Sequence, residues 1–209
     1  MSERESSRPE AGVAAPRAHA KAGSPAQDPT DEELEAQWKQ GSSPAFAILF
    51  ERWHARAYGY AMRRTNGDVT LSEDVAQRAF VNLYAKPPAG TSKGSFKGLL
   101  FTVIENELVS EARKRGRRKE TDIAPTLAFQ DNGSESPDAT VASIEEKKII
   151  EAALAELPEE ERTVVLLREV EGLSFREVCE ATGLTRDMAR GRLGKALERL
   201  RRALKRRAS

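Results

Sequence analysis

The sequence predicts an all-α protein in which a flexible acidic linker joins two small helical domains, the C-terminal one a helix-turn-helix. Aromatic residues make up only 6% of the chain and charged residues 32%, and no long run of β-branched residues alternates with polar ones. Apolar residues instead recur at steps of three and four, the period of amphipathic helices. Residues 120–143 interrupt this pattern with five acids, no lysine or arginine, two prolines and a glycine, as expected for a linker.

The N-terminal segment, residues 1–30, is rich in alanine, proline, serine and glycine and has no apolar period, so we expect a disordered tail. The whole chain of 209 residues has a net charge of +1 and a single cysteine, Cys179, which excludes an internal disulfide. No apolar run reaches membrane-spanning length and no signal peptide opens the chain. We therefore expect a cytoplasmic protein that does not bind a membrane.

The first domain is expected to span residues 31–119 and to contain four helices. The first runs from Asp31 to about Gly41, and the second opens at Ser43-Pro44. The third starts at residues 71–74, after a turn at residues 66–68, and Ser95 caps the fourth. The residues expected to face the core are Phe46, Phe50, Trp53, Ala57 and Ala61 in the second helix, Val75, Ala79, Phe80, Leu83 and Tyr84 in the third, and Phe96, Leu100, Val103, Ile104 and Leu108 in the fourth.

The fourth helix ends in a run of seven residues, 113–119, of which six are cationic. One or two cations at a helix C-terminus would simply complement the helix dipole. Six in seven repel one another, which favours a surface that binds a polyanion.

The second domain, residues 144–209, contains the spacing of a helix-turn-helix. After an apolar run from Val164 to Leu167, Ser174 and Glu177 have the spacing of a capping box that starts a short helix. Gly183 ends this helix, and Thr185 caps a longer one that follows. A short helix, a glycine-containing turn and a longer helix are typical of this motif.

The last helix is strongly basic on one side. Between Thr185 and Arg207 it carries ten lysines and arginines against two acids, a local charge of +8 in a chain whose total is +1. The cations that fall outside its apolar stripe are Arg186, Arg190, Lys195, Arg199 and Arg202. A solvated surface is the alternative, but one-sided charge on a correctly spaced motif favours DNA binding.

At this point the chain resembles the extracytoplasmic-function (ECF) group of bacterial sigma factors, over about residues 43–206 without the linker. Leu157-Pro158-Glu159, residues 171–178, 189–193 and 196–201 resemble the family's region four, which binds the −35 promoter element. Residues 73–77 with Phe80 resemble the helix that binds the clamp helices of the largest polymerase subunit, and residues 95–101 through Asn106 resemble the helix that opens the −10 element. The chain differs from the family's usual residues at two positions: Leu99 stands where tryptophan is usual, and Arg78 where an acid is frequent.

The resemblance implies a set of binding residues. Contacts to the −35 element are expected from Ser174, Arg176, Thr185, Arg186, Asp187, Arg190, Arg192 and Lys195; contacts to the −10 element from Lys97, Asn106, Arg113, Lys114 and Arg115; and contacts to polymerase from Glu73, Asp74, Gln77 and Phe80. Arg186 and Arg190 are the best candidates for recognising bases, since arginine binds guanine bidentately. Asn106 and the loop from Gly90 to Gly94 are candidates for holding an extruded base. Arg176 and Arg192 have a structural role as the alternative.

The resemblance further implies three partners: core RNA polymerase, through the clamp helices and other core surfaces; promoter DNA; and an anti-sigma factor of unknown identity, because the chain contains no sensor domain. No cofactor and no catalytic residue is expected, since metal-ligand spacing, a phosphate-binding glycine loop and a paired nucleophile and base are lacking. Two alternatives stay open. One is a helix-turn-helix regulator that acts without being a polymerase subunit, and the other is a decoy that binds polymerase or an anti-sigma factor without initiating transcription.

Overall fold

The computed structural model describes residues 28–87, 94–119 and 141–208, with side chains described except for those of residues 117–119, 141–144 and 208. These ranges contain helices and no strand, so the predicted fold class is confirmed for the part of the chain that the structure describes. Residues 1–27 of the predicted tail, 120–140 of the predicted linker and 90–93 of the predicted loop lie outside the described residues. Residues 141–143, which were expected to belong to the linker, instead begin a helix.

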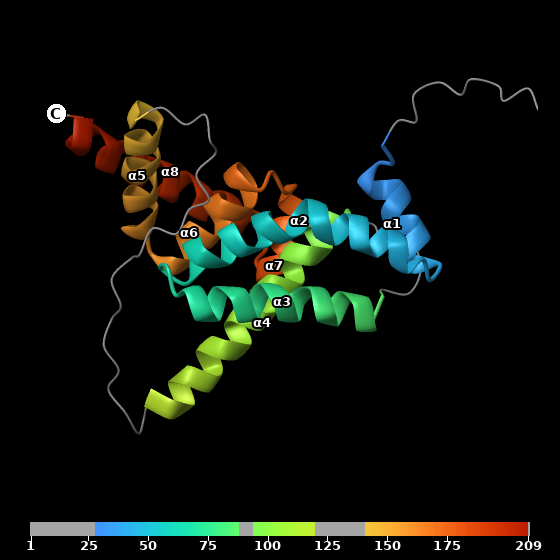
Figure 1. Cartoon of the computed structure of the whole chain (residues 1–209). Helices are drawn as coiled ribbons and strands as arrows, with labels where there is room; N and C mark the ends of the chain where they lie inside the picture. The colour runs from blue at the N-terminus through green and yellow to red at the C-terminus, as the bar shows by residue number, and fades with distance from the viewer. Residues whose placement is uncertain (1–27, 88–93, 120–140, 209) are drawn as a thin grey trace, which may run out of the picture.

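The N-terminal half contains four helices with side-chain caps at their starts. They are α1 (Asp31–Lys39), α2 (Ser43–Arg64), α3 (Val69–Ala85) and α4 (Phe96–Lys119). Thr30, Ser42 and Asp68 accept hydrogen bonds from the first turns of α1, α2 and α3, and Ser95 Oγ accepts one from Gly98 N in α4. In Figure 1, α2 lies along α3, and the C-terminal end of α4 projects beyond the other helices.

Two of the residues predicted to be buried are exposed instead. Phe50 in α2 is 42% exposed and Tyr84 in α3 is 52% exposed, whereas the neighbouring Leu49 is fully buried. Leu49 lies three residues after Phe46 and four before Trp53, so it shares their face of the helix, and Phe50 is rotated to the edge. The Phe50 ring still packs edge-on against Phe80, with 4.9 Å between the ring centroids.

The C-terminal half contains the predicted helix-turn-helix. Its elements are α5 (Val141–Ala155), α6 (Glu159–Val165), a π-helical turn η1 (Leu166–Val170), α7 (Phe175–Thr182) and α8 (Arg186–Ala208). Ser174 and Glu177 form the predicted capping box at the start of α7. Gly183 ends α7 in the left-handed conformation, with φ of 70°, and Thr185 Oγ1 accepts a hydrogen bond from the first turn of α8.

The two halves pack against each other, although the sequence suggested units that would bind separate stretches of DNA. Helix α7 lies on α4, and α6 contacts α2. One apolar cluster runs through both halves, from Phe96 and Leu100 of α4 to Leu173 and Val178 beside and within α7, all four of them buried. The physical reason is that the buried face of α7 needs apolar partners, which α4 supplies in addition to α8.

A buried polar network joins α2 to α4 beneath this core. Glu105 accepts hydrogen bonds from Tyr60 Oη at 2.5 Å, Arg64 Nε at 2.8 Å and Arg64 Nη2 at 3.1 Å. Burial alone would lower the pKa of the Arg64 guanidinium, but the Glu105 carboxylate raises it above its usual value. Burial, reinforced by the charge on Glu105, also raises the pKa of Tyr60. The three side chains therefore satisfy one another in a site closed to water.

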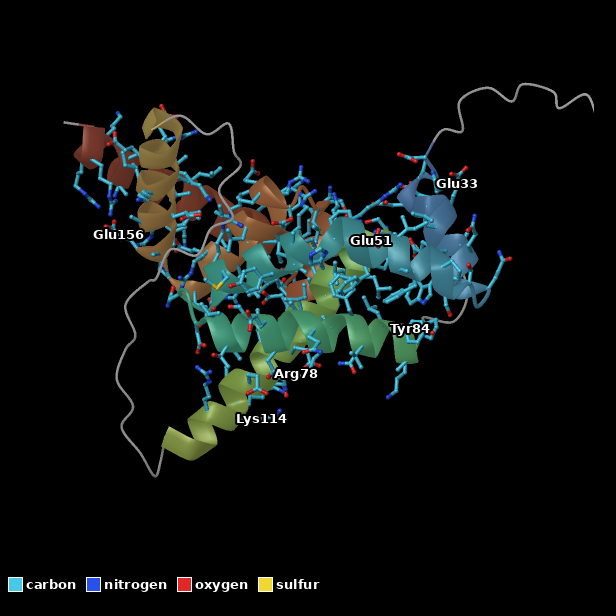
Figure 2. All side chains as sticks on the ribbon, in the orientation of Figure 1. Glu33, Glu51, Arg78, Tyr84, Lys114 and Glu156 are labelled. Carbon is cyan, nitrogen blue, oxygen red and sulfur yellow. The ribbon has the colours of Figure 1, made fainter. Side chains whose placement is uncertain are left out.

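We predict that Glu105→Gln lowers the free energy of unfolding by about 3 kcal/mol, because it leaves the buried Arg64 charge without its main partner. Urea unfolding at neutral pH measures this loss. Glu51→Gln makes the same charge change on the outer side of α2, where Glu51 is exposed (Figure 2), and should alter the free energy by less than about 0.5 kcal/mol. Equal losses for both variants would contradict the role of the network.

Candidate nucleic-acid interface

Helix α8 buries its small residues and presents its cations to solvent. Ala189, Ala196 and Ala203 are buried against the rest of the C-terminal half. Among the predicted DNA-binding residues at the start of α8, Arg192 is half-buried. The others are exposed: Thr185, Arg186, Asp187, Arg190 and Lys195. Met188 is 48% exposed, whereas its neighbour Ala189 is fully buried. The start of α8 therefore offers a continuous polar and cationic face.

Two arginines pack against one aromatic ring at this face. The guanidinium carbons of Arg168 and Arg190 lie 4.9 Å and 5.4 Å from the centroid of the Phe175 ring. Arg168 Nη1 also donates a hydrogen bond of 2.5 Å to the Leu173 carbonyl. Such stacking restricts the rotamers of an exposed arginine. The sequence did not indicate this contact between Phe175, Arg168 and Arg190, because it depends on how α7 and α8 pack.

The remaining predicted residues of the helix-turn-helix have partners within the protein. Arg192 forms an ion pair of 2.7 Å with Glu160, and Arg176 one of 3.8 Å with Glu180. Ser174 is the cap of α7, and its Oγ donates to Glu177 Oε2 at 2.7 Å. In each of these ion pairs the acid is largely exposed, so a phosphate group could replace it.

The predicted −10 residues lie along α4, and they differ in whether other side chains of the protein bind them. Asn106 and Arg113 are exposed. Lys114 pairs with Glu111 at 2.8 Å and Arg115 with Asp68 at 3.0 Å, on the part of α4 that projects from the body, where Figure 2 labels Lys114. Lys97, at the other end of the helix, donates a hydrogen bond of 2.9 Å to the Gly172 carbonyl of the C-terminal half.

The predicted polymerase-binding residues lie on α3, and one of them, Phe80, is buried. Glu73, Asp74 and Gln77 are exposed. Phe80 is only 4% exposed and packs against Phe46 and Phe50, so it supports the surface from below and is not available for direct contact. The helical period explains this, because Phe80 shares the buried face of α3 with Ala76 and Leu83.

Arg78, which stands where the family often has an acid, bridges α3 to α4. It hydrogen-bonds Asp74 within α3 and pairs with Glu111 at 2.8 Å and Glu107 at 3.7 Å (Figure 2 labels Arg78). Hydrogen bonds from Lys114 and Arg78 lower the pKa of Glu111. The arginine therefore neutralises part of the acidic charge that α3 would otherwise present.

One carboxylate, that of Glu177, caps both α7 and α4. Its Oε1 accepts hydrogen bonds from Ser95 Oγ at 2.6 Å and Ser95 N at 3.3 Å, and its Oε2 accepts from Ser174 Oγ at 2.7 Å and Ser174 N at 2.8 Å. We call these four bonds the Glu177 bridge. Burial alone would raise the pKa of Glu177, but the bonds from the two serines outweigh it and hold the pKa at about 2, against an ordinary 4.5. The carboxylate is thus strongly preferred in its charged form.

The Glu177 bridge predicts a pH dependence. Because the folded-state pKa is depressed, the bridge stabilises the protein fully above pH 4.5 and loses its contribution as the pH falls towards about 2. Glu177→Gln should therefore unfold more easily than the parent protein at pH 7, and the difference in free energy of unfolding should shrink below pH 4.5. Urea unfolding of both proteins from pH 7 to pH 3 measures this, and a difference independent of pH would contradict it.

Comparison with known families matches both halves of the chain. Residues 49–118 match the family described as Sigma-70 region 2, and residues 147–200 match the family described as Sigma-70, region 4. The first match runs from within α2 almost to the end of α4, and the second from within α5 to Leu200 in α8.

Similar proteins are found over nearly the same length. The ECF RNA polymerase sigma-E factor of Haemophilus influenzae is 27% identical over 177 residues, which cover 81% of this chain and 92% of that protein. The RNA polymerase sigma-H factor of Pseudomonas aeruginosa is 26% identical over 181 residues, covering 83% and 93%.

Two solved structures share the fold. The sigma factor RpoE of Bartonella quintana, solved in complex with the anti-sigma factor NepR, superposes with a TM-score of 0.62 at 22% identity, over 77% of this chain and 96% of that one. CnrH, solved with the cytosolic domain of CnrY, gives a TM-score of 0.58 at 24% identity, over 84% and 97%. In the part of this chain that the structure describes, no helix has the length and apolarity needed to cross a membrane.

Proposed function

Because this chain belongs to the ECF group of bacterial sigma factors, which bind core RNA polymerase and direct transcription initiation, we propose that its two basic helices divide the promoter between them. In this assignment the first turns of α8 bind the −35 element and α4 binds the −10 element. Residues 31–119 act as the region-two domain and residues 144–209 as the region-four domain.

The observation that carries the −35 assignment is the exposed cationic start of α8 beside Phe175. Arg186 and Arg190 are exposed there and belong to the recognition helix of a helix-turn-helix. Arg190 is held over the Phe175 ring, so its bidentate fork is partly preorganised for a guanine. Thr185 and Lys195 flank it and suit phosphate contacts, whereas Asp187 suits a cytosine amino group.

The −10 and polymerase assignments use the opposite ends of the N-terminal half. Exposed Asn106 and the cations from Arg113 onwards suit a single strand and its phosphates. Glu73, Asp74 and Gln77 form the exposed polar edge of α3 that would meet the polymerase clamp, with Phe80 supporting it from the core. Since α3 also carries Arg78, the contact should depend less on acidic charge than in relatives with an acid at that position.

The proposal also includes a regulatory protein partner and a cellular location. One structural neighbour was solved in complex with an anti-sigma factor, which supports an anti-sigma factor as a partner of this chain as well. A factor that acts on polymerase and chromosomal DNA works in the cytoplasm. Its action is binding and remodelling, without chemistry of its own.

A run-off transcription assay with purified core polymerase and a genomic promoter library tests the proposal. Discrete transcripts that depend on the protein would support it, and their upstream sequences would define both promoter elements. Tight binding to DNA without polymerase and without transcripts would instead favour an independent regulator. Binding to core polymerase without transcripts would favour the decoy.

We predict that Arg190→Ala relaxes specificity at one base pair, with a loss of about 1–3 kcal/mol on the preferred base. Lys195→Ala should lower affinity equally on all sequences and reduce the salt slope of binding by about one unit, because it removes one phosphate contact. Binding of the reconstituted holoenzyme to promoter variants at several salt concentrations separates the two effects. An equal loss on every sequence for Arg190→Ala would refute base recognition by Arg190.

We further predict that Phe175→Leu reproduces part of the Arg190→Ala effect, since leucine fills the space but offers no ring face for the guanidinium. The loss should fall on the same base pair. The loss of binding free energy in the double variant Phe175→Leu/Arg190→Ala should be smaller than the sum of the two single losses, as expected for two side chains that act through one contact. Fully additive losses would show that Phe175 does not position Arg190.

A further inference from the structure

The exposed side of α8 carries two glycines three residues apart, Gly191 and Gly194, which we call the glycine pair. Both residues lie in the interior of a helix of 23 residues. Glycine weakens a helix interior relative to alanine, because the unfolded chain gains more freedom at glycine than at any other residue. Two such residues within one turn therefore require a physical reason.

The protein itself does not require glycine at either position. Neither residue has the positive φ that explains the glycine at Gly183. Apart from the surrounding helix, no atom of the residues that the structure describes lies within 4 Å of a Cβ built on Gly191 or Gly194. By contrast, a Cβ on Gly98 would lie 2.6 Å from Glu177 Oε1. The missing side chains of the glycine pair therefore indicate a partner outside the chain that comes close to α8.

The long side chains next to the glycine pair are bound to other elements of the protein. The guanidinium carbon of Arg190 lies 5.4 Å from the centroid of the Phe175 ring in α7. Arg192 forms an ion pair of 2.7 Å with Glu160 of α6. The two arginines that flank Gly191 in the sequence therefore extend towards different helices, and the backbone of α8 is exposed at Gly191.

An exposed methionine extends the glycine pair towards the start of the helix. Met188 is 48% exposed and lies three residues before Gly191, so Met188, Gly191 and Gly194 form one row on the surface of α8. The backbone amides inside a helix are already hydrogen-bonded, so a glycine there presents only C–H groups. Asp187 and Lys195 are exposed and border this row. We call these three residues the apolar row, because they interrupt a charged surface.

The apolar row matches one feature of the major groove. The recognition helix of a helix-turn-helix lies in that groove and directs its first turns at the base edges. Arginine, lysine and aspartate suit the polar atoms of those edges, whereas a row of C–H groups offers them no hydrogen bond. The apolar group that the groove presents is the C5-methyl of thymine. A methyl group fits the space that a missing Cβ leaves, and the contact removes apolar surface from water on both sides.

We propose that the apolar row receives thymine methyl groups of the −35 element, and that the glycine pair lets these methyl groups reach the backbone of α8. The inference rests on the proposed function, because it takes the assignment of α8 to the −35 element as given. It adds a second kind of recognition to the same site. Arg190 selects a guanine through hydrogen bonds, and the glycine pair selects thymine through shape and apolar contact.

Replacing thymine by deoxyuridine removes only the methyl group and tests the contact from the DNA side. Holoenzyme reconstituted with the parent protein is bound to a promoter obtained from the library, in which each thymine of the −35 element, on either strand, is replaced in turn. Binding should weaken about four-fold at one thymine or more, as expected for one buried methyl group. Equal affinity for the parent promoter and every substituted promoter would overturn the inference.

Gly191→Ala and Gly194→Ala test the contact from the protein side, because each places a methyl group where we expect that of thymine. Holoenzyme with either variant should bind the unmodified promoter at least about ten-fold more weakly than the parent holoenzyme. Deoxyuridine at one thymine should then strengthen binding by the variant, although it weakens binding by the parent protein. This reversal couples one Cβ to one base methyl. Unchanged binding by both variants, or a loss that is the same with thymine and deoxyuridine at every position, would overturn the inference.

Two controls separate this contact from folding and from the proposed function. Alanine favours a helix more than glycine does, so the thermal unfolding midpoint of Gly191→Ala and Gly194→Ala should stay the same or rise. Gly59→Ala in α2 makes the same change where the new Cβ meets only Arg63 Nη1, at 3.6 Å, and it should keep the affinity and the thymine preference of the parent protein. Absence of transcripts with the parent protein would overturn the proposed function, and the inference with it. Transcripts from promoters that show no effect of the thymine methyl would overturn the inference alone.

Discussion

The position of one carboxylate, that of Glu177, ties the folding of the helix-turn-helix to the packing of the two halves. Its two oxygens complete the first turns of two helices whose caps, Ser95 and Ser174, belong to different halves of the chain. Helix N-termini have amide groups without helical partners and a positive end of the dipole, so a single anion can satisfy both. The hydrogen bonds from Ser95 and Ser174 to Glu177 lower its pKa. If α7 moves away, α4 loses a cap whereas α7 keeps its own capping box.

Acidic residues of α6 pair with cations of α8, the helix that we propose binds the −35 element. Glu160 pairs with Arg192 and Glu161 with Arg199, so the acidic entry helix α6 lies beside the basic helix α8. Glu160 is exposed, so a phosphate can replace it with small loss, whereas Glu161 is buried. The contact at Glu177 differs, because it is buried among apolar residues of both halves. The ion pair of Arg192 is therefore a surface contact, whereas the contact at Glu177 belongs to the buried packing between α7 and α4.

The features that sequence analysis predicted well are those encoded within a few residues. The Ser174–Glu177 capping box, the left-handed Gly183 and the Ser95 cap each depend on neighbours within three or four positions, and the structure contains all of them. The contact of Ser95 with Glu177 spans 82 residues, and no local pattern specifies it. Leu49 and Phe50 are both apolar neighbours, so only the tertiary packing decides which of them is buried. For the same reason Phe80 was expected at a surface that it supports from within.

The π-helical turn η1 has a consequence for how this motif can vary in evolution. A π turn holds one residue more than an α turn, and here it ends the helix that brings Arg168 to the Phe175 ring. Removing one residue from 166–170 would convert the wider turn into a regular helical turn, so that the residues of this turn would take new positions around the helix axis. Leu166 and Leu167 are both buried and Arg168 lies over the Phe175 ring, so the positions of all three depend on the wider turn. Homologous chains should therefore tolerate substitutions in this turn far better than single-residue deletions.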